Sequence, residues 1–259
     1  MNEQQPDVAV HLVGQPDANE CEKEPMMSFE SNVKSTLTLL EAMRTSSCKR
    51  MIFTSTAMVY GPRVEPLREE DSPTPMNTYG HHKLIAEQLI RGYENEYGLS
   101  CTILRLFNVY GNDPWLGKDV LSIFVRRALQ GEPIIVRGGS GYRDFVYVGD
   151  VARAICATLD RGTPKTTLNI GTGTKLTIRE LADIVKERCE KVRIVETEGP
   201  TYGLYADISR ARETLGFSPE HPRKRIPLFI DEVTRVKDPP PNELTRVNND
   251  LVTDRCDSS

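Results

Sequence analysis

Apolar residues in the first half of the chain occur either in short continuous runs or at helical spacing. The continuous runs predict buried strands at residues 8–13, 51–55 and 101–106. Apolar residues at helical spacing predict helices at 27–43 and 78–97, and Gly98 is a plausible stop for the second. Strands that alternate with helices in this way predict an α/β fold with a parallel sheet.

The pattern becomes less regular after Gly111. Helices are predicted at 119–130 and 177–189, a turn that leads into a strand at 131–137, strands at 145–148 and 167–170, and a loop at 62–75. Gly149 and Asp150 are expected to cap a helix that runs to Leu159. From residue 237 the chain is polar and contains three consecutive prolines, which predicts a flexible tail.

Composition narrows the possible classes of protein. A net charge of −4 over 259 residues argues against a dedicated nucleic-acid binder, which would carry a basic stripe. No apolar run approaches the length of about 18 residues that spans a membrane, and the N-terminus lacks a secretion signal. The six cysteines form no C-x-x-C pair, so we expect reduced thiols, no metal site and a cytoplasmic location.

Tyr79 and Lys83 are the main candidates for chemistry. They are four residues apart, so on a helix their side chains share one face, about 6 Å apart at Cβ. A free tyrosine has a pKa of about 10, and a neighbouring ammonium is expected to lower it. The pair would then act as a general acid and base on an alcohol hydroxyl. The alternative, for a motif this short, is an exposed tyrosine beside a solvated lysine.

The strands on either side favour the functional interpretation. The predicted strand at 51–55 runs into Thr54-Ser-Thr56, and the strand at 101–106 is followed by Asn108. Parallel strands bring such residues to the carboxyl edge of a sheet, where ligands bind in open α/β folds. Thr56 could instead be an ordinary β-branched strand residue, but its place at the strand end favours a site.

These motifs, taken together from about residue 7 to about residue 219, resemble the extended short-chain dehydrogenase/reductase family in its NAD-dependent nucleotide-sugar epimerase/dehydratase branch. The segments that carry the resemblance are His11-Leu-Val-Gly, Asn32-Val, Thr54-Ser-Thr-Ala-Met-Val-Tyr-Gly, Tyr79 with Lys83, Arg105-Leu-Phe-Asn-Val-Tyr-Gly, Arg143-Asp-Phe-Val-Tyr-Val, Asn169-Ile-Gly-Thr-Gly and Ala206-Asp-Ile-Ser-Arg-Ala. The resemblance implies a partial NAD-binding Rossmann-like domain at 7–111 with later returning segments. It implies a smaller α/β substrate lobe at 112–236, followed by the tail at 237–259.

The family begins with a strand, a Gly-rich turn and a helix that hold the dinucleotide pyrophosphate. No such turn precedes Val8, and at the usual size of a βαβ unit about 60 residues of the family pattern are absent. The glycines at 138–141 and 171–173 are expected to be turns of the substrate lobe. A sheet without its first strands exposes an edge, so we expect poor solubility or a partner that covers it.

The resemblance also implies roles for individual residues. Catalysis falls to Tyr79, Lys83 and Thr56, with Thr56 bonded to the reacting oxygen. The residues implied to contact NAD are Leu12, Val13, Gly14, Asn32, Thr54, Tyr79 and Lys83. The residues implied to bind the nucleotide sugar are Thr56, Asn108 and Arg143.

Two of these assignments have alternatives. Asn108 could equally be a turn residue. Arg143 suits a diphosphate because of its planar fork, although a surface ion pair with Asp144 is also conceivable. A second family arginine falls near Thr197 and Glu198, where this chain has none, which predicts a weakened or altered diphosphate grip.

The residues after Thr56 select among reactions of the family. Dehydratases carry Thr-Asp-Glu here, whereas this chain has Thr56, Ala57 and Met58, which cannot supply the acid and base for elimination. The resemblance is therefore to UDP-galactose 4-epimerases, and implies epimerisation at C4 of a nucleotide-diphosphate hexose through a 4-keto intermediate. Reduction of a 4-ketohexose and a non-catalytic remnant that binds sugar nucleotide or a protein partner remain alternatives. Relatives commonly form homodimers through two helices, one of which includes the Tyr/Lys segment.

Overall fold

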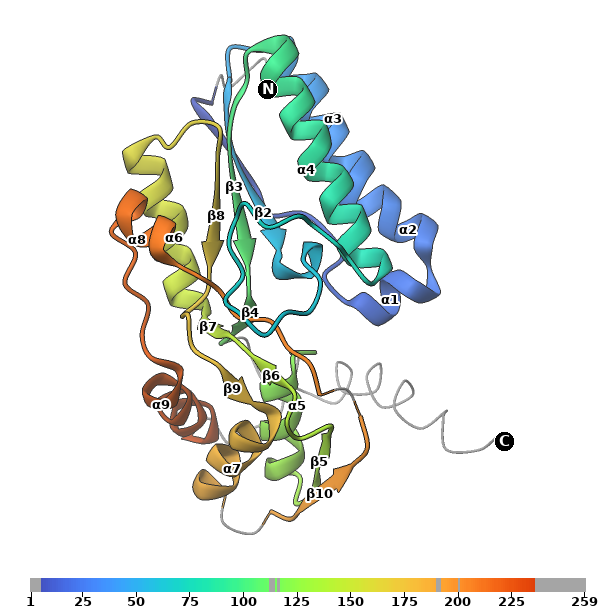
Figure 1. The fold of residues 1–259 in the computed structure, drawn as a ribbon, viewed down its shortest axis with the longest axis vertical. Coiled ribbons are helices and arrows are strands. Elements are labelled where there is room, and N and C mark those ends of the chain that lie inside the picture. The colour runs from blue at the N-terminus through green and yellow to red at the C-terminus, as the bar shows by residue number, and fades with distance from the viewer. Residues whose placement is uncertain (1–5, 112–114, 116, 190–191, 200, 236–259) are drawn as a thin grey trace.

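A four-stranded parallel sheet forms the centre of the upper part of the molecule (Figure 1). The computed structural model describes residues 6–111, 115, 117–189, 192–199 and 201–235. The strands are β1 (Val8–His11), β2 (Arg50–Thr56), β3 (Ser100–Leu106) and β8 (Thr166–Ile170), in the order β1-β2-β3-β8. Within the described residues β1 pairs only with β2, so β1 is an edge strand.

Helices cover both faces of this sheet (Figure 1). One face carries α1 (Ala18–Lys23), α2 (Pro25–Phe29), a π-helical turn (Glu30–Lys34), α3 (Ser35–Arg44) and α4 (Thr78–Tyr97). The other carries α6 (Val148–Arg161) and α8 (Ser209–Leu215). Buried side chains such as Phe53 and Ile90 on one face, and Leu104 and Leu168 on the other, fill the two interfaces. Each such side chain contributes about 1.5–3 kcal/mol by leaving water.

Helix α4 has a clear start and end in the sequence. The Asn77 side chain accepts a hydrogen bond from the amide of Gly80 (2.8 Å), which satisfies a free donor of the first turn. Gly98 ends the helix in the left-handed conformation at φ 68°. The predicted helix at 78–97 and its glycine stop are therefore confirmed.

The lower part of the molecule in Figure 1 is a smaller α/β unit with its own hydrophobic cluster. Strands β5 (Ile134–Arg137) and β10 (Ile194–Thr197) pair in parallel, and α5 (Val120–Leu129), α7 (Ile178–Arg188) and α9 (Pro222–Arg235) pack around them. Short pairs connect it to the sheet above: β4 (Asn108–Tyr110) with β7 (Phe145–Tyr147), and β6 (Tyr142–Arg143) with β9 (Leu176–Thr177).

The predicted loop at 62–75 joins these two parts of the molecule. Leu67 forms a β-bridge with Ala206. The hydroxyl of Tyr142 donates to the carbonyl of Arg63 at 2.6 Å, and the amine of Lys175 donates to the carbonyl of Val64 at 2.8 Å. The loop thus ties the segment that follows β2 to the lobe that carries β6 and β9.

Several sequence-based expectations need correction. The first strand ends at His11 rather than Val13, and Leu12 and Val13 are exposed. The single helix expected at 27–43 is divided by the π-helical turn. Gly149 and Asp150 do not cap α6, because the N-cap position is Tyr147 and the Asp150 carboxylate instead accepts from the amide of Glu220 at 3.2 Å.

The parallel α/β architecture is confirmed. The tail predicted at 237–259 lies outside the described residues. No helix among the described residues is both long enough and apolar enough to cross a membrane.

Candidate active site

Tyr79 and Thr56 lie near each other at the carboxyl end of β2. Thr56 is the last residue of β2, and its side chain accepts a hydrogen bond from the amide of Met58 (3.2 Å), which starts a short 3-10 helix at Ala57–Val59. Tyr79 lies in the first turn of α4, and the Thr56 side chain is close enough to its phenol to lower the pKa of that phenol. The structure thus brings the predicted acid/base and the predicted hydroxyl together.

The direction of the Tyr79 pKa differs from the sequence-based prediction. Burial raises the pKa of Tyr79 to about 12, and the neighbouring Thr56 side chain lowers it only in part. The prediction of a lowered pKa is therefore wrong for this arrangement, because desolvation penalises the phenolate more than its neighbours stabilise it. The Lys83 ammonium is not among the groups that shift the phenol.

Lys83 is itself held in an unusual environment. Its side chain is buried, and its Nζ lies 4.0 Å from the centre of the Phe53 ring. Burial lowers the pKa of Lys83 to about 8, while the carboxylate of Glu87, one helical turn further along α4, raises it in part. Lys83 forms no hydrogen bond or ion pair with the residues that the structure describes. It is thus a buried, easily titrated amine with free hydrogen-bonding capacity beside Tyr79 on α4.

A group of polar atoms lies just after the end of β1. We call it the polar corner, and it is formed by Gly14, Gln15, Ser28, Asn32 and Lys83. The Nδ2 of Asn32 donates to the carbonyl of Gln15 at 3.2 Å and to the Oγ of Ser28 at 3.3 Å. Its Oδ1 is buried and has no hydrogen-bond partner among the described residues. A Cβ on Gly14 would lie 2.5 Å from this Oδ1 and 4.0 Å from Lys83 Nζ, so a larger residue there would displace the Asn32 side chain.

Residues predicted to contact NAD lie in this corner and just before it. The backbone of Leu12, Val13 and Gly14 is at the surface, next to the unpartnered Asn32 oxygen. Asn32 belongs to the π-helical turn, a local geometry that is frequent at functional sites. An unsatisfied buried acceptor beside an amine with free donors fits a ligand rich in hydroxyl groups, such as a dinucleotide. The residues present therefore fit the cofactor.

Thr54 was also predicted to contact the cofactor. Its hydroxyl donates to the carbonyl of His11 at 3.3 Å. This bond ties β2 to the end of β1, immediately before the corner. In the structure Thr54 thus supports the backbone of the corner, with its hydroxyl already paired.

The other two predicted substrate residues, Asn108 and Arg143, lie on β4 and β6, in the connection between the sheet and the smaller lobe (Figure 1). The amide of Asn108 donates to the carbonyl of Asp144 at 2.9 Å, and its side chain makes no hydrogen bond with described residues. The Arg143 guanidinium donates to the carbonyls of Tyr142 (2.8 Å) and Tyr202 (3.1 Å).

Arg143 does not pair with Asp144, the alternative that its neighbour suggested. The Asp144 carboxylate is fully buried and accepts bonds from Thr172, Gly173 and Ala206. Within the described part of the chain no carboxylate forms an ion pair with Arg143, and burial lowers its pKa. A half-buried guanidinium without a counter-ion suits an anionic group such as a diphosphate.

A buried ion pair behind the site was missed by the sequence analysis. Arg105 on β3 donates two hydrogen bonds to Glu87 on α4, at 2.7 and 3.1 Å, and both side chains are buried. The hydroxyls of Ser55 and Tyr60 also bond to this pair, at 2.5 and 2.7 Å. One signal was available in the sequence, since Glu87 follows Tyr79 and Lys83 at the same helical spacing.

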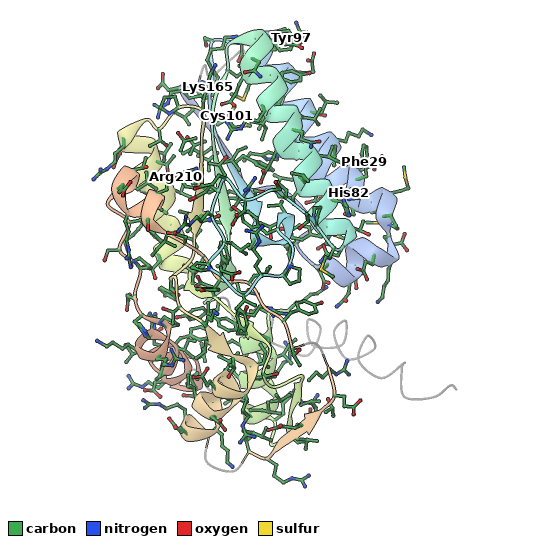
Figure 2. The ribbon with its side chains drawn as sticks, viewed as in Figure 1. Phe29, His82, Tyr97, Cys101, Lys165 and Arg210 are labelled. Atoms are coloured by element: carbon green, nitrogen blue, oxygen red, sulfur yellow. The ribbon has the colours of Figure 1, made fainter. Side chains whose placement is uncertain are left out.

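His82 and Phe29, which have no predicted role, lie next to Ser28 of the polar corner. His82 Nδ1 lies 2.8 Å from Ser28 Oγ, and its ring meets that of Phe29 edge to face at 5.7 Å. Figure 2 shows the labelled Phe29 and His82 close together, where α2 packs against α4. No group of three or more His, Cys, Asp or Glu residues that could hold a metal occurs in the part of the chain that the structure describes.

Comparison with known proteins gives consistent relatives. The model of the NAD dependent epimerase/dehydratase family matches residues 1–171. A protein from Methanocaldococcus jannaschii is 37% identical over 223 residues, which cover 83% of this chain and 72% of that protein. A UDP-glucose 4-epimerase from Rhizobium leguminosarum bv. trifolii is 31% identical over 245 residues, 85% of this chain and 75% of its own.

Solved structures show the same fold. The UDP-glucose 4-epimerase of Thermotoga maritima, solved with UDP-glucose, superposes with a TM-score of 0.84 and 31% identity, covering 90% of this chain and 79% of that one. The UDP-glucose 4-epimerase of Thermus thermophilus, solved in complex with NAD, gives 0.81 and 29%, with 90% and 79% covered.

Proposed function

The chain belongs to the NAD-dependent epimerase/dehydratase family, and on that basis we propose that it epimerises C4 of a nucleotide-diphosphate hexose with Tyr79 as acid and base. The single observation that carries this proposal is the proximity of the Tyr79 phenol and the Thr56 side chain at the carboxyl end of β2. That edge is where open α/β sheets bind their ligands. The relatives named UDP-glucose 4-epimerases support UDP-glucose as the first substrate to test.

We propose that NAD is held at the polar corner by Asn32, Lys83 and the backbone of Leu12 to Gly14. The unpartnered Oδ1 of Asn32 and the free amine of Lys83 support this placement. When bound, NAD supplies the acceptor and donor of the C4 hydride and a positive charge on its oxidised ring. Asn108 and Arg143 are proposed to hold the diphosphate of the substrate. The main anion contact would be the guanidinium of Arg143, which donates to two carbonyls and has no carboxylate partner among the described residues.

The chain's own residues then handle the proton. Tyr79, as phenolate, takes the proton of the 4-hydroxyl while the C4 hydride leaves, which produces a 4-keto sugar. Tyr79 returns the proton to the same oxygen after hydride has returned to the other face of C4. The neighbouring Thr56 hydroxyl lowers the pKa of the phenol and so favours the phenolate. Ala57 and Met58 have no acidic or basic group, which favours this simple cycle over elimination.

The experiment measures UDP-galactose formed from UDP-glucose by the purified full chain with added NAD. Tyr79→Phe should abolish turnover, since the ring remains and only the proton carrier is lost. Tyr97→Phe is the matched control on the same helix, because Tyr97 is exposed, and it should keep full activity. Retained turnover by Tyr79→Phe would refute the assigned role of Tyr79.

The dinucleotide that accompanies the purified protein separates the alternatives. Tightly bound NAD supports epimerisation, whereas exchangeable NADPH supports reduction of a 4-ketohexose by the same residues. Absence of any dinucleotide binding by the folded chain supports the binding-only alternative.

We further propose that the chain self-associates or binds a partner through surfaces near this site. Met26, Met27 and Phe29 on α2 are exposed, beside α4, and support a homodimer through these helices. The free edge of β1 supports a partner that adds to the sheet. Sedimentation of the purified chain would distinguish a dimer from a monomer. The cytoplasmic location stays a prediction.

A further inference from the structure

The two amide hydrogens of Asn32 are both used by fixed acceptors. One goes to the backbone carbonyl of Gln15 and the other to the hydroxyl of Ser28. A rotated amide would place its oxygen against the Gln15 carbonyl, with two acceptors facing each other. The observed orientation is therefore imposed by the surroundings, and it directs the unpartnered Oδ1 toward Gly14.

Ser28 can act on Asn32 only if its own hydroxyl proton points elsewhere. His82 Nδ1 lies 2.8 Å from Ser28 Oγ, on the side of α4, and is the acceptor that the geometry provides. Ser28 is buried, and the edge of the Phe29 ring against His82 restricts the imidazole. Burial lowers the pKa of His82, which favours the neutral ring whose Nδ1 accepts a proton.

We propose that Ser28 and His82 are positioning residues for Asn32, which hold its carboxamide so that Oδ1 receives a hydrogen bond from a hydroxyl or amide donor of the bound dinucleotide. The chain of bonds runs from His82 Nδ1 through Ser28 Oγ to Asn32 Nδ2. It connects α4, which carries Tyr79 and Lys83, to the π-helical turn that carries Asn32. The inference rests on the proposed function in that the ligand of the corner is NAD.

Ser28 and His82 can raise the affinity for the dinucleotide without contacting it. An acceptor that is already oriented when the ligand arrives avoids the ordering that a free side chain would undergo. Without His82, the Ser28 hydroxyl is free to turn its proton toward other acceptors, and Asn32 then has an alternative orientation. The expected effect is on binding of the dinucleotide, since the nucleotide sugar is held by other residues.

The test is titration calorimetry of the full chain with NAD and, separately, with UDP-glucose. Ser28→Ala and His82→Ala should each raise the Kd for NAD about tenfold, the equivalent of one lost hydrogen bond, and leave the Kd for UDP-glucose unchanged. His82→Asn should restore NAD affinity, because the asparagine amide reaches the position of Nδ1. His82→Gln should not, because its amide reaches the position of Nε2. His81→Ala, at an exposed neighbour, is the matched control.

The calorimetric results distinguish the positioning role of Ser28 and His82 from the proposed binding of NAD itself. Equal NAD affinity in the wild type and all variants overturns the positioning role while NAD binding itself stands. Equal losses for NAD and UDP-glucose show general damage to the fold and also overturn it, as does rescue by Gln as complete as rescue by Asn. A wild-type chain that binds UDP-glucose and no NAD overturns the proposed cofactor and, with it, this inference.

Discussion

Removing the charge of Glu87 is the most revealing perturbation of this fold. Glu87 and Arg105 are both buried, and two hydrogen bonds of 2.7 and 3.1 Å join them across α4 and β3. Glu87→Gln keeps the size of the side chain but leaves the Arg105 charge buried without its counter-ion. A broken buried pair of this kind costs about 3–5 kcal/mol of unfolding free energy.

The double variant shows whether the pair or the packing is responsible. Arg105→Met alone leaves the Glu87 carboxylate unpaired, so it should lose a similar amount. The combination of Glu87→Gln and Arg105→Met removes both charges and should lose only about 1–3 kcal/mol, because the hydroxyls of Ser55 and Tyr60 still lose charged partners.

Urea denaturation of the full chain, followed by circular dichroism, measures these free energies. Glu30→Gln is the control, since Glu30 pairs with Lys34 at the surface and should give no measurable loss. A loss below about 1 kcal/mol for Glu87→Gln, or a double variant whose loss is the sum of the single losses, would refute the reasoning. Glu87→Gln should also lower the pKa of Lys83, which is about 8 in the wild type, because the carboxylate that raises it is removed. NAD affinity falls as Lys83 loses its proton with rising pH, so in this variant the fall should begin at a lower pH than in the wild type.

Three further predictions follow from the site and the core. Thr56→Val should lower kcat about tenfold by removing the hydroxyl that favours the Tyr79 phenolate, with Thr56→Ser near wild type. Arg143→Met should raise KM for UDP-glucose about tenfold or more with a smaller change in kcat, and a KM within twofold of wild type would contradict its proposed contact. His11 is buried with a pKa lowered to about 4, so the unfolded chain takes up the proton first as pH falls below about 6.5. Stability should therefore fall between pH 6.5 and 4 by about 3 kcal/mol, and His11→Gln, which can keep the bond to Thr36, should flatten this part of the urea-denaturation pH profile.

The elements with the strongest local signals were predicted closely from the sequence. Helix α4 matches its predicted limits because apolar spacing, the Asn77 cap and Gly98 all agree on them. The π-helical turn at Glu30–Lys34 was not predicted, because its bonds depend on packing against α4 rather than on local spacing. Asp150 looked like a cap, but its carboxylate is used by Arg153 and by the amide of Glu220 from a distant segment.

Local sequence also predicted only part of the candidate site. Thr56 and Tyr79 could be placed together because parallel strands and the following helix share one edge of the sheet. Ser28 and His82 are 54 residues apart, and nothing in either local sequence indicates that they bond. The unpartnered oxygen of Asn32 is likewise a property of the surrounding packing, which only the structure reveals.

The electrostatics of Tyr79 and Lys83 explain why spacing alone gave the wrong direction for the phenol. Burial disfavours the charged form of both groups, so the pKa of the phenol rises to about 12 while that of the amine falls to about 8. Near neutral pH, Tyr79 is therefore mainly an uncharged phenol beside a weakly basic amine. Its phenolate becomes accessible only when positive charge is added nearby. In the proposed reaction the oxidised cofactor brings that charge, so proton abstraction would be confined to the complex in which the hydride acceptor is already in place.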